Sequence, residues 1–105
     1  MQFLVIARDG ADEGAQGRRM AARPAHFERL PAMLEAGEVL MGGAMLDDAG
    51  RMIGSSLLVD FPDRAALDRW LEREPYVTGD VWLDIEVVPF RLAVSGAIDK
   101  AAAGR

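Results

Sequence analysis

The chain has 105 residues, of which half are apolar and 28% are charged, and it carries a formal net charge of −5. This length and composition predict a single folded domain and argue against a disordered chain. The acidic balance argues against nucleic-acid or anionic-membrane partners, and the lack of cysteine excludes disulfides, thiolate zinc sites and a cysteine nucleophile.

The N-terminal sequence does not have the pattern of a signal peptide. The first eight residues lack the basic start and the small-residue cleavage site of a signal peptide. No apolar run reaches the roughly 18 residues of a membrane-spanning helix. We therefore expect a cytoplasmic protein. Residues 95–105 are small and weakly patterned, which predicts a loose tail or short helix outside the core.

The first third of the chain predicts a strand, a loop and a helix. Residues 3–7 are a short continuous apolar run, typical of a strand buried on both faces. Residues 9–17 indicate a loop. Residues 18–36 favour a helix that ends at Gly37, and its two prolines predict a broken helix rather than a straight one. The predicted buried stripe of this helix holds Phe27, Leu30 and Leu34.

The middle of the chain predicts a β-hairpin. Residues 38–46 indicate a second strand, which contains the Gly42-Gly43 pair, and residues 53–61 indicate a third. The turn Asp47-Asp48-Ala49-Gly50 joins them. Alternation along the third strand places Leu57, Val59 and Phe61 on one face and Ser56, Leu58 and Asp60 on the other.

The last third predicts a second helix and a fourth strand. Asp63 is the expected N-cap of the helix, and Pro75 ends it. Residues 76–80 indicate a turn. Residues 81–88 alternate, which predicts a strand with two different faces, and Pro89 closes it. The predicted buried stripe of the second helix holds Leu67, Trp70 and Leu71.

The resulting order, β-α-β-β-α-β, predicts an α+β protein of the ferredoxin-like type with an antiparallel four-stranded sheet. Two helices cover only one face of such a sheet. The other face carries Trp82, Val88 and part of the first strand, which is too much apolar surface to leave in water. A second subunit packed sheet to sheet with twofold symmetry is the simplest cover, so we predict a homodimer.

His26 and Glu74 are the candidate acid–base pair. His26 is the only histidine, and histidine is the one residue type whose unperturbed side-chain pKa lies near neutrality. Glu74 prolongs the apolar stripe of the second helix, three residues after Leu71. Because both helices cover one sheet face, the two side chains are placed to approach each other and to act as general base or acid. Taken singly, each is more often an ordinary surface or half-buried residue.

Other residues carry weaker signals. Arg23, three residues before the histidine, is either a ligand for a substrate anion or a solvated helix residue. The Gly42-Gly43 pair lets the backbone approach a ligand, although a strand bulge is the commoner reason for such a pair. Tyr76 either donates a hydrogen bond at the rim of a site or simply packs. Ser55 lies in no nucleophile-elbow motif, which excludes serine-hydrolase chemistry.

The sequence predicts no cofactor and no metal site. A single histidine without cysteine argues against a dedicated transition-metal site. No phosphate-binding glycine loop is present.

Several elements together resemble the YCII family of YciI-like proteins. Arg23-Pro24-Ala25-His26 is followed by Leu30, and Glu74-Pro75-Tyr76-Val77 comes later in the chain. The elements between and after them are Gly37-Glu38-Val39-Leu40-Met41-Gly42-Gly43-Ala44, Gly54-Ser55 and Val87-Val88-Pro89-Phe90. The resemblance covers about residues 1–92, which we take as one domain, followed by a C-terminal tail at residues 93–105.

This resemblance implies a ferredoxin-like fold of the dimeric α/β-barrel type, with subunits joined through their sheets. It implies an active site built from a histidine, here His26, and an aspartate, whose position is held by Glu74 in this chain. A related branch is linked to dehydrochlorination of chlorinated hydroxyquinols. The predicted substrate-binding residues are Gly42, Ser55 and Tyr76, which match positions near the family's cleft, together with Arg23.

Functions from different classes remain open. The first is a small cofactor-independent enzyme, in which His26, oriented by Glu74, exchanges a proton with a small organic molecule during elimination or isomerisation. The second is a non-catalytic module that binds a small ligand or an interaction partner. A third interpretation makes the pair a structural bridge between two helices.

Overall fold

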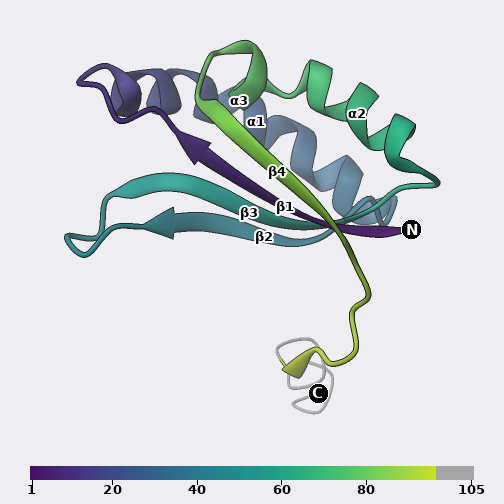
Figure 1. Cartoon of the computed structure of the whole chain (residues 1–105). Helices are drawn as coiled ribbons and strands as arrows, with labels where there is room; N and C mark the ends of the chain where they lie inside the picture. Colours follow the sequence, from purple (N-terminus) through teal and green to yellow (C-terminus); the bar gives the residue numbers. More distant parts are fainter. Residues whose placement is uncertain (97–105) are drawn as a thin grey trace.

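The computed structural model describes residues 1–96; residues 97–105, most of the predicted tail, lie outside the described residues. The predicted β-α-β-β-α-β order is confirmed, with one additional short helix before the last strand (Figure 1). The elements are β1 (Gln2–Asp9), α1 (Ala15–Glu35), β2 (Val39–Leu46), β3 (Met52–Asp60), α2 (Arg64–Arg73), α3 (Pro75–Thr78) and β4 (Trp82–Phe90).

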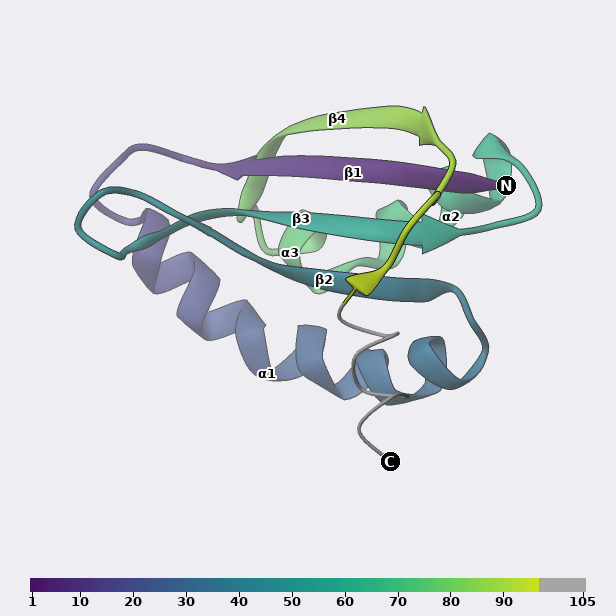
Figure 2. The same cartoon turned by 90° about the horizontal axis from the view of Figure 1, so that it is seen from below.

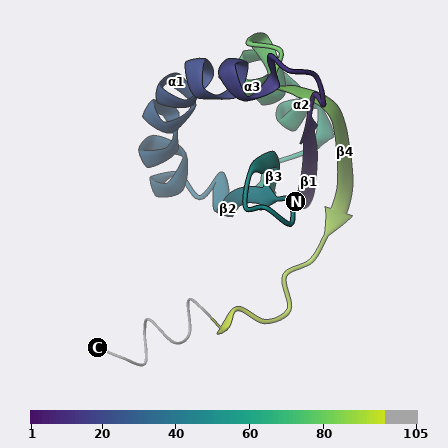
Figure 3. The same ribbon diagram turned by 90° about the vertical axis from the view of Figure 1, so that its left-hand side faces the viewer.

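The four strands form one antiparallel sheet in the order β2-β3-β1-β4, which confirms the α+β prediction. All three helices lie on the same face of this sheet (Figure 3). Within residues 1–96 no helix covers the opposite face, and the chain leaves β4 on that side (Figure 1). The fold is therefore two layers deep, with the core between helices and sheet.

The sheet is buried fully on its helix face only. Phe3, Val5 and Ala7 of β1 point into the core and are 0–1% exposed. The alternating Leu4 and Ile6 are half-buried in this chain. The prediction that this strand is buried on both faces is therefore wrong for the single chain, because only one face has a layer packed on it.

Helix α1 departs most from its prediction. It continues through Pro24 and Pro31, so the predicted break is wrong, and its axis bends along its length instead (Figure 2). A proline removes one backbone hydrogen bond, and the remaining bonds of a long helix hold the two halves together. Phe27 and Leu34 of the predicted stripe are about half exposed. The buried residues of α1 are Ala15, Arg19, His26 and Met33.

Helices α2 and α3 meet at Glu74. The Asp63 side chain caps α2 as predicted, accepting a hydrogen bond from the backbone N–H of Ala66 at 2.8 Å. Pro75 ends α2 as predicted, but it starts the one-turn α3 where a turn was predicted, because proline fits the first position of a helix. Leu67 and Trp70 are buried as predicted, and Leu71 packs against the core in part.

Strand β4 corrects two further predictions. A register shift beside Asp9 of β1 turns Trp82 toward the helices, where it is 3% exposed, so its predicted place on the open face is wrong. Val88 does lie on the open face and is 37% exposed. Pro89 lies within β4 rather than closing it, because an edge strand needs hydrogen bonds on one side only.

Gly54 of β3 tests the close contact between β3 and β1. A Cβ atom there would overlap the backbone oxygen of Ala7, whereas a Cβ at Gly43 would meet no atom within 4 Å. We expect Gly54→Ala to lower the free energy of unfolding by about 1–3 kcal/mol and Gly43→Ala to change it by less than about 0.5 kcal/mol. Urea unfolding measures both, and equal effects would contradict this strand register.

Candidate active site

A pocket of about 190 Å³ opens between α1, the β2–β3 hairpin and α3. Five predicted site residues line it, namely Arg23, His26, Gly42, Ser55 and Tyr76. Glu74 does not line the pocket but lies behind the histidine. The remaining lining residues are Arg19, Phe27, Gly43, Ala44, Met52 and Leu57.

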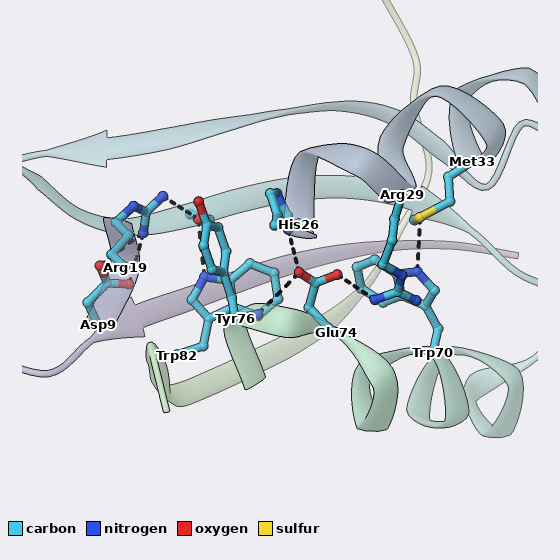
Figure 4. A network of polar contacts seen from close by, with 10 residues as sticks. Asp9, Arg19, His26, Arg29, Met33, Trp70, Glu74, Tyr76 and Trp82 are labelled. Carbon is cyan, nitrogen blue, oxygen red and sulfur yellow. Dashed lines mark hydrogen bonds and ion pairs between the residues drawn. The ribbon is translucent and has the colours of Figure 1, made fainter. Parts of the chain in front are cut away.

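The imidazole of His26 is held by Glu74. Its Nδ1 atom is hydrogen-bonded to Oε1 of Glu74 across the space between α1 and the α2–α3 junction (Figure 4). His26 is 5% exposed and Glu74 is 1% exposed. A carboxylate only accepts hydrogen bonds, so Nδ1 carries a hydrogen, and in the neutral ring the free lone pair then lies on Nε2. The structure thus brings the predicted pair together.

Glu74 has two partners besides the histidine. Its Oε2 atom accepts a hydrogen bond from Nη1 of Arg29 at 2.9 Å. Its Oε1 atom also accepts from the backbone N–H of Tyr76 at 3.3 Å, which caps α3. Burying a carboxylate without partners costs several kcal/mol, and this set of donors offsets that cost. The guanidinium of Arg29 lies over Trp70, 5.3 Å from the ring centroid.

Aromatic rings fix the other sides of the imidazole. Tyr76 stacks on His26 with ring centroids 4.1 Å apart and an interplanar angle of 16°. Trp82 contacts both rings edge-on, with its ring centroid 6.0 Å from that of His26 and 5.4 Å from that of Tyr76. Burial raises the pKa of the Tyr76 hydroxyl above its usual value of 10.0. Tyr76 is therefore neutral at physiological pH, and its hydroxyl has a hydrogen to donate.

A second buried polar cluster lies at the same pocket. Arg19 is 3% exposed, and its Nη1 atom donates to both carboxylate oxygens of Asp9, at 3.0 and 2.9 Å. Its Nη2 atom donates to Oγ of Ser55 at 2.9 Å, and Nε1 of Trp82 donates to the same Oγ at 3.2 Å (Figure 4). The guanidinium carbon lies 4.8 Å from the centroid of Tyr76, so this ring separates the two clusters.

Sequence reasoning missed four of these residues. Asp9 was assigned to a loop and Trp82 to the wrong sheet face, while Arg19 and Arg29 were not singled out at all. One signal was present in the sequence: positions 19, 26 and 33 are seven residues apart, which places them on one helix face two turns apart. That spacing marks the buried face of α1, although two of its three members are polar.

Arg23 and Gly42 contribute shape rather than fixed polar contacts. Arg23 is exposed and lies over Phe27, with its guanidinium carbon 4.5 Å from the ring centroid. Gly42 lies in regular register opposite Leu57, and a Cβ there would overlap the Leu57 side chain. The predicted bulge at the glycine pair is therefore wrong. The irregularities of β2 fall between Val39 and Met41 and between Met45 and Leu46.

The arrangement supports proton exchange with a bound molecule. One nitrogen of the imidazole is occupied by a carboxylate, and the other has no hydrogen-bond partner among residues 1–96. An imidazole held in this way accepts a proton at Nε2 and returns it.

In the described part of the chain, no three His, Cys, Asp or Glu side chains are grouped to hold a metal ion. No helix there is long and apolar enough to cross a bilayer.

The sequence matches one family along nearly its whole described length. The YCII-related domain matches residues 1–91. Protein YciI from Escherichia coli O6:H1 is 31% identical over 97 residues, covering 87% of this chain and 97% of the relative. Protein YciI from Shigella flexneri shows the same identity and coverage.

Two solved structures share the fold. The first is TftG from Burkholderia phenoliruptrix, a 5-chloro-2-hydroxyhydroquinone dehydrochlorinase in complex with 2,5-dihydroxybenzoquinone. Its TM-score is 0.71 at 22% identity, and the match covers 89% of this chain and 96% of that chain. PA3566 from Pseudomonas aeruginosa has a TM-score of 0.51 at 19% identity, covering 88% of this chain and 94% of that chain.

The buried Glu74 carboxylate should contribute to stability. Glu74→Ala leaves the Arg29 guanidinium and Nδ1 of His26 without their acceptor, so we expect the free energy of unfolding to fall by about 3 kcal/mol. Glu72→Ala, at an exposed position of α2 two residues earlier, is the matched control and should change it by less than about 0.5 kcal/mol. Urea unfolding of both variants measures the difference, and similar losses would contradict the burial of an ion pair here.

Proposed function

The chain belongs to the YCII family, and from that premise we propose that it is a small enzyme that transfers a proton on a one-ring organic molecule bound beside His26. The observation that carries this proposal is the buried Glu74–His26 contact at the wall of a pocket. The family resemblance implies an aspartate at the position of Glu74. The longer glutamate still reaches the imidazole in this chain.

The pocket has the size and lining for a single ring. A cavity of about 150 Å³ is enough to hold benzene, and this pocket measures about 190 Å³. The rings of His26, Phe27 and Tyr76 line it and favour a flat partner. Gly42 adds no side chain, so a ligand is able to lie close to the β2 backbone.

The proposed reaction is general acid–base catalysis by His26. Nε2 takes a proton from the substrate, and the negative charge of Glu74 stabilises the imidazolium that forms. The electron pair left on the substrate then expels a leaving group from a neighbouring atom, which is an elimination. Alternatively it moves to another atom of the ring system, which takes the proton back from Nε2, and the result is an isomerisation. Neither route requires a cofactor.

The comparison with TftG supports the elimination route. Dehydrochlorination, the activity in the name of that protein, is an elimination from a hydroxylated ring. This makes 5-chloro-2-hydroxyhydroquinone and related hydroxyquinols the first compounds to test as substrates. A non-catalytic module would bind such compounds in the same pocket without converting them.

The catalytic role of His26 is tested by a conservative substitution. We expect His26→Gln to lower turnover of a converted hydroxyquinol by roughly 10²- to 10⁴-fold, because a positioned acid–base group supplies about that much. Glu28→Gln, at an exposed position of the same helix, should leave turnover unchanged. Chloride release and ring proton exchange in deuterated water measure the rate. Binding without conversion by the wild type would favour the non-catalytic module, and full activity of His26→Gln would rule out the pair.

We further propose that two chains pack through their helix-free sheet faces, as in a dimeric α/β barrel. This face carries apolar residues from all four strands, including the half-exposed Met41 and Val88. Leu4 and Ile6 lie between them and are only half-buried. At one end of this face, Nη1 of Arg8 lies 3.6 Å from Oδ2 of Asp84. Such an exposed ion pair is typical of the polar rim of an interface.

A charge on the open face should prevent this association. We expect the wild type to sediment at about twice its chain mass of 11.4 kDa and Val88→Lys to sediment as a single chain, because burying an unpaired charge at an interface costs several kcal/mol. Leu34→Lys, at an exposed position of α1, is the control and should leave the mass unchanged. A wild type that is monomeric at micromolar concentration would contradict the proposed dimer.

A further inference from the structure

Arg29 and His26 share one carboxylate. Arg29 follows His26 by three residues on α1, so both side chains reach Glu74 from one face of the same helix. Nδ1 of His26 contacts Oε1 of Glu74, and Nη1 of Arg29 donates to Oε2 at 2.9 Å (Figure 4). Arg29 is not among the residues that line the pocket. Any effect of Arg29 on a bound molecule must therefore pass through Glu74 and His26.

The charges of these three side chains balance only when the imidazole is neutral. The guanidinium of Arg29 keeps its charge in a folded protein, and it neutralises the single charge of the Glu74 carboxylate. A proton on His26 would leave one positive charge unbalanced in a site where the histidine is 5% exposed and the glutamate 1%. Burial and the neighbouring positive charge both disfavour that state. If position 29 carried no charge, the same proton would balance the carboxylate instead.

Aromatic packing keeps the guanidinium beside the carboxylate. Arg29 lies over the ring of Trp70, 5.3 Å from the centroid, where a cation is attracted by the face of the ring. The ring itself is fixed, because Trp70 is 8% exposed and its Nε1 donates to Sδ of Met33 on α1 at 3.2 Å (Figure 4). Arg29 is thus confined between Trp70 and Glu74, although 27% of its side chain is exposed.

The other charged groups at the pocket do not replace Arg29. Arg19 of α1 is balanced by Asp9 of β1, at 2.9 Å. Arg23 of α1 is exposed to solvent, which screens its charge. The rings that α3 and β4 place against the imidazole, Tyr76 and Trp82, carry no charge, and burial raises the pKa of the Tyr76 hydroxyl further. The β2–β3 hairpin lines the pocket with uncharged residues only.

We propose that Arg29 is a positioning residue that keeps His26 uncharged before the substrate binds, by balancing the charge of Glu74 from the side away from the pocket. This inference rests on the proposed function, because it assigns a further residue to the same proton transfer. Glu74 stabilises the imidazolium during the reaction, and Arg29 limits that stabilisation. The ring is therefore free to accept a proton at Nε2 and to release it again.

Substitutions that separate charge from hydrogen bonding test this role in the absence of any substrate. Arg29→Gln keeps a donor for Glu74 but removes the charge, so we expect the proton affinity of His26 to rise at least about 10-fold. Arg29→Lys keeps the charge and should leave that affinity within about threefold of the wild type. The NMR signals of the imidazole carbons, followed against pH, measure it directly, because His26 is the only histidine.

Arg69→Gln is the matched control. Arg69 is exposed on α2 and lines the same outer groove as Arg29, but it takes no part in the contacts of Glu74, so the affinity should not change. If Arg29→Gln fails to fold, Arg29→Met, whose side chain is able to pack on Trp70, takes its place with the same expected rise. An unchanged proton affinity in a folded neutral variant, or an equal rise in Arg29→Lys, would overturn the inference.

The pH profile of turnover gives a second readout, which a purely structural ion pair would not move. With a converted hydroxyquinol, Arg29→Gln should lose activity at neutral pH and recover it at higher pH, where His26 gives up its proton. We expect the acidic limb of kcat/KM to move by the same factor as the proton affinity, about 10-fold or more in proton concentration. Arg29→Lys should restore the wild-type profile. A loss of activity that is equal at every pH would contradict the proposed role.

These readouts are separable from the proposed catalysis. The NMR titration needs no substrate, so it decides the role of Arg29 even if no hydroxyquinol is converted. A raised proton affinity in Arg29→Gln together with full activity of His26→Gln would retain the charge balance and rule out the proton transfer. An unchanged proton affinity together with loss of turnover in His26→Gln would do the reverse.

Discussion

The site depends on one carboxylate that is shielded from water. Glu74 is 1% exposed, and three donors from α1 and α3 surround it: Nδ1 of His26, Nη1 of Arg29 and the backbone N–H of Tyr76. A buried charge is tolerated only when it is paired and hydrogen-bonded. Each donor must therefore stay in place, and the carboxylate sets the position of α1 relative to the junction of α2 and α3.

This constraint pre-organises the pocket. The imidazole is held from behind by Glu74 and on its face by Tyr76, whose ring also lies under the guanidinium of Arg19. Arg19 then holds Ser55 through a second buried network. The imidazole of His26 and the hydroxyl of Ser55 are thus held by packed helices and strands rather than by loops. Sites of this kind keep their geometry without reorganisation when a ligand binds.

Local signals predicted the frame of the fold. The hairpin turn at Asp47–Gly50, the cap at Asp63 and the helix end before Pro75 each follow from one or two residues. The buried face of α1 could not be found in this way. The apolar spacing predicted that Phe27 is buried, whereas the structure buries Arg19 against partners from distant parts of the chain. The sheet face on which Trp82 lies depends on a register shift between β1 and β4, and no residue of β4 indicates this shift in the sequence. The burial of these two side chains therefore depends on contacts between distant parts of the chain, which the local sequence pattern does not contain.

The most direct test is the protonation pattern of the one imidazole. A long-range ¹H–¹⁵N correlation spectrum of uniformly labelled protein, recorded where the ring is neutral, needs no assignment because His26 is the only histidine. The contact with Glu74 predicts a hydrogen on Nδ1 and a bare Nε2. A spectrum in which Nε2 carries the hydrogen, or in which both nitrogens share it through rapid exchange, would contradict a histidine oriented by a buried carboxylate.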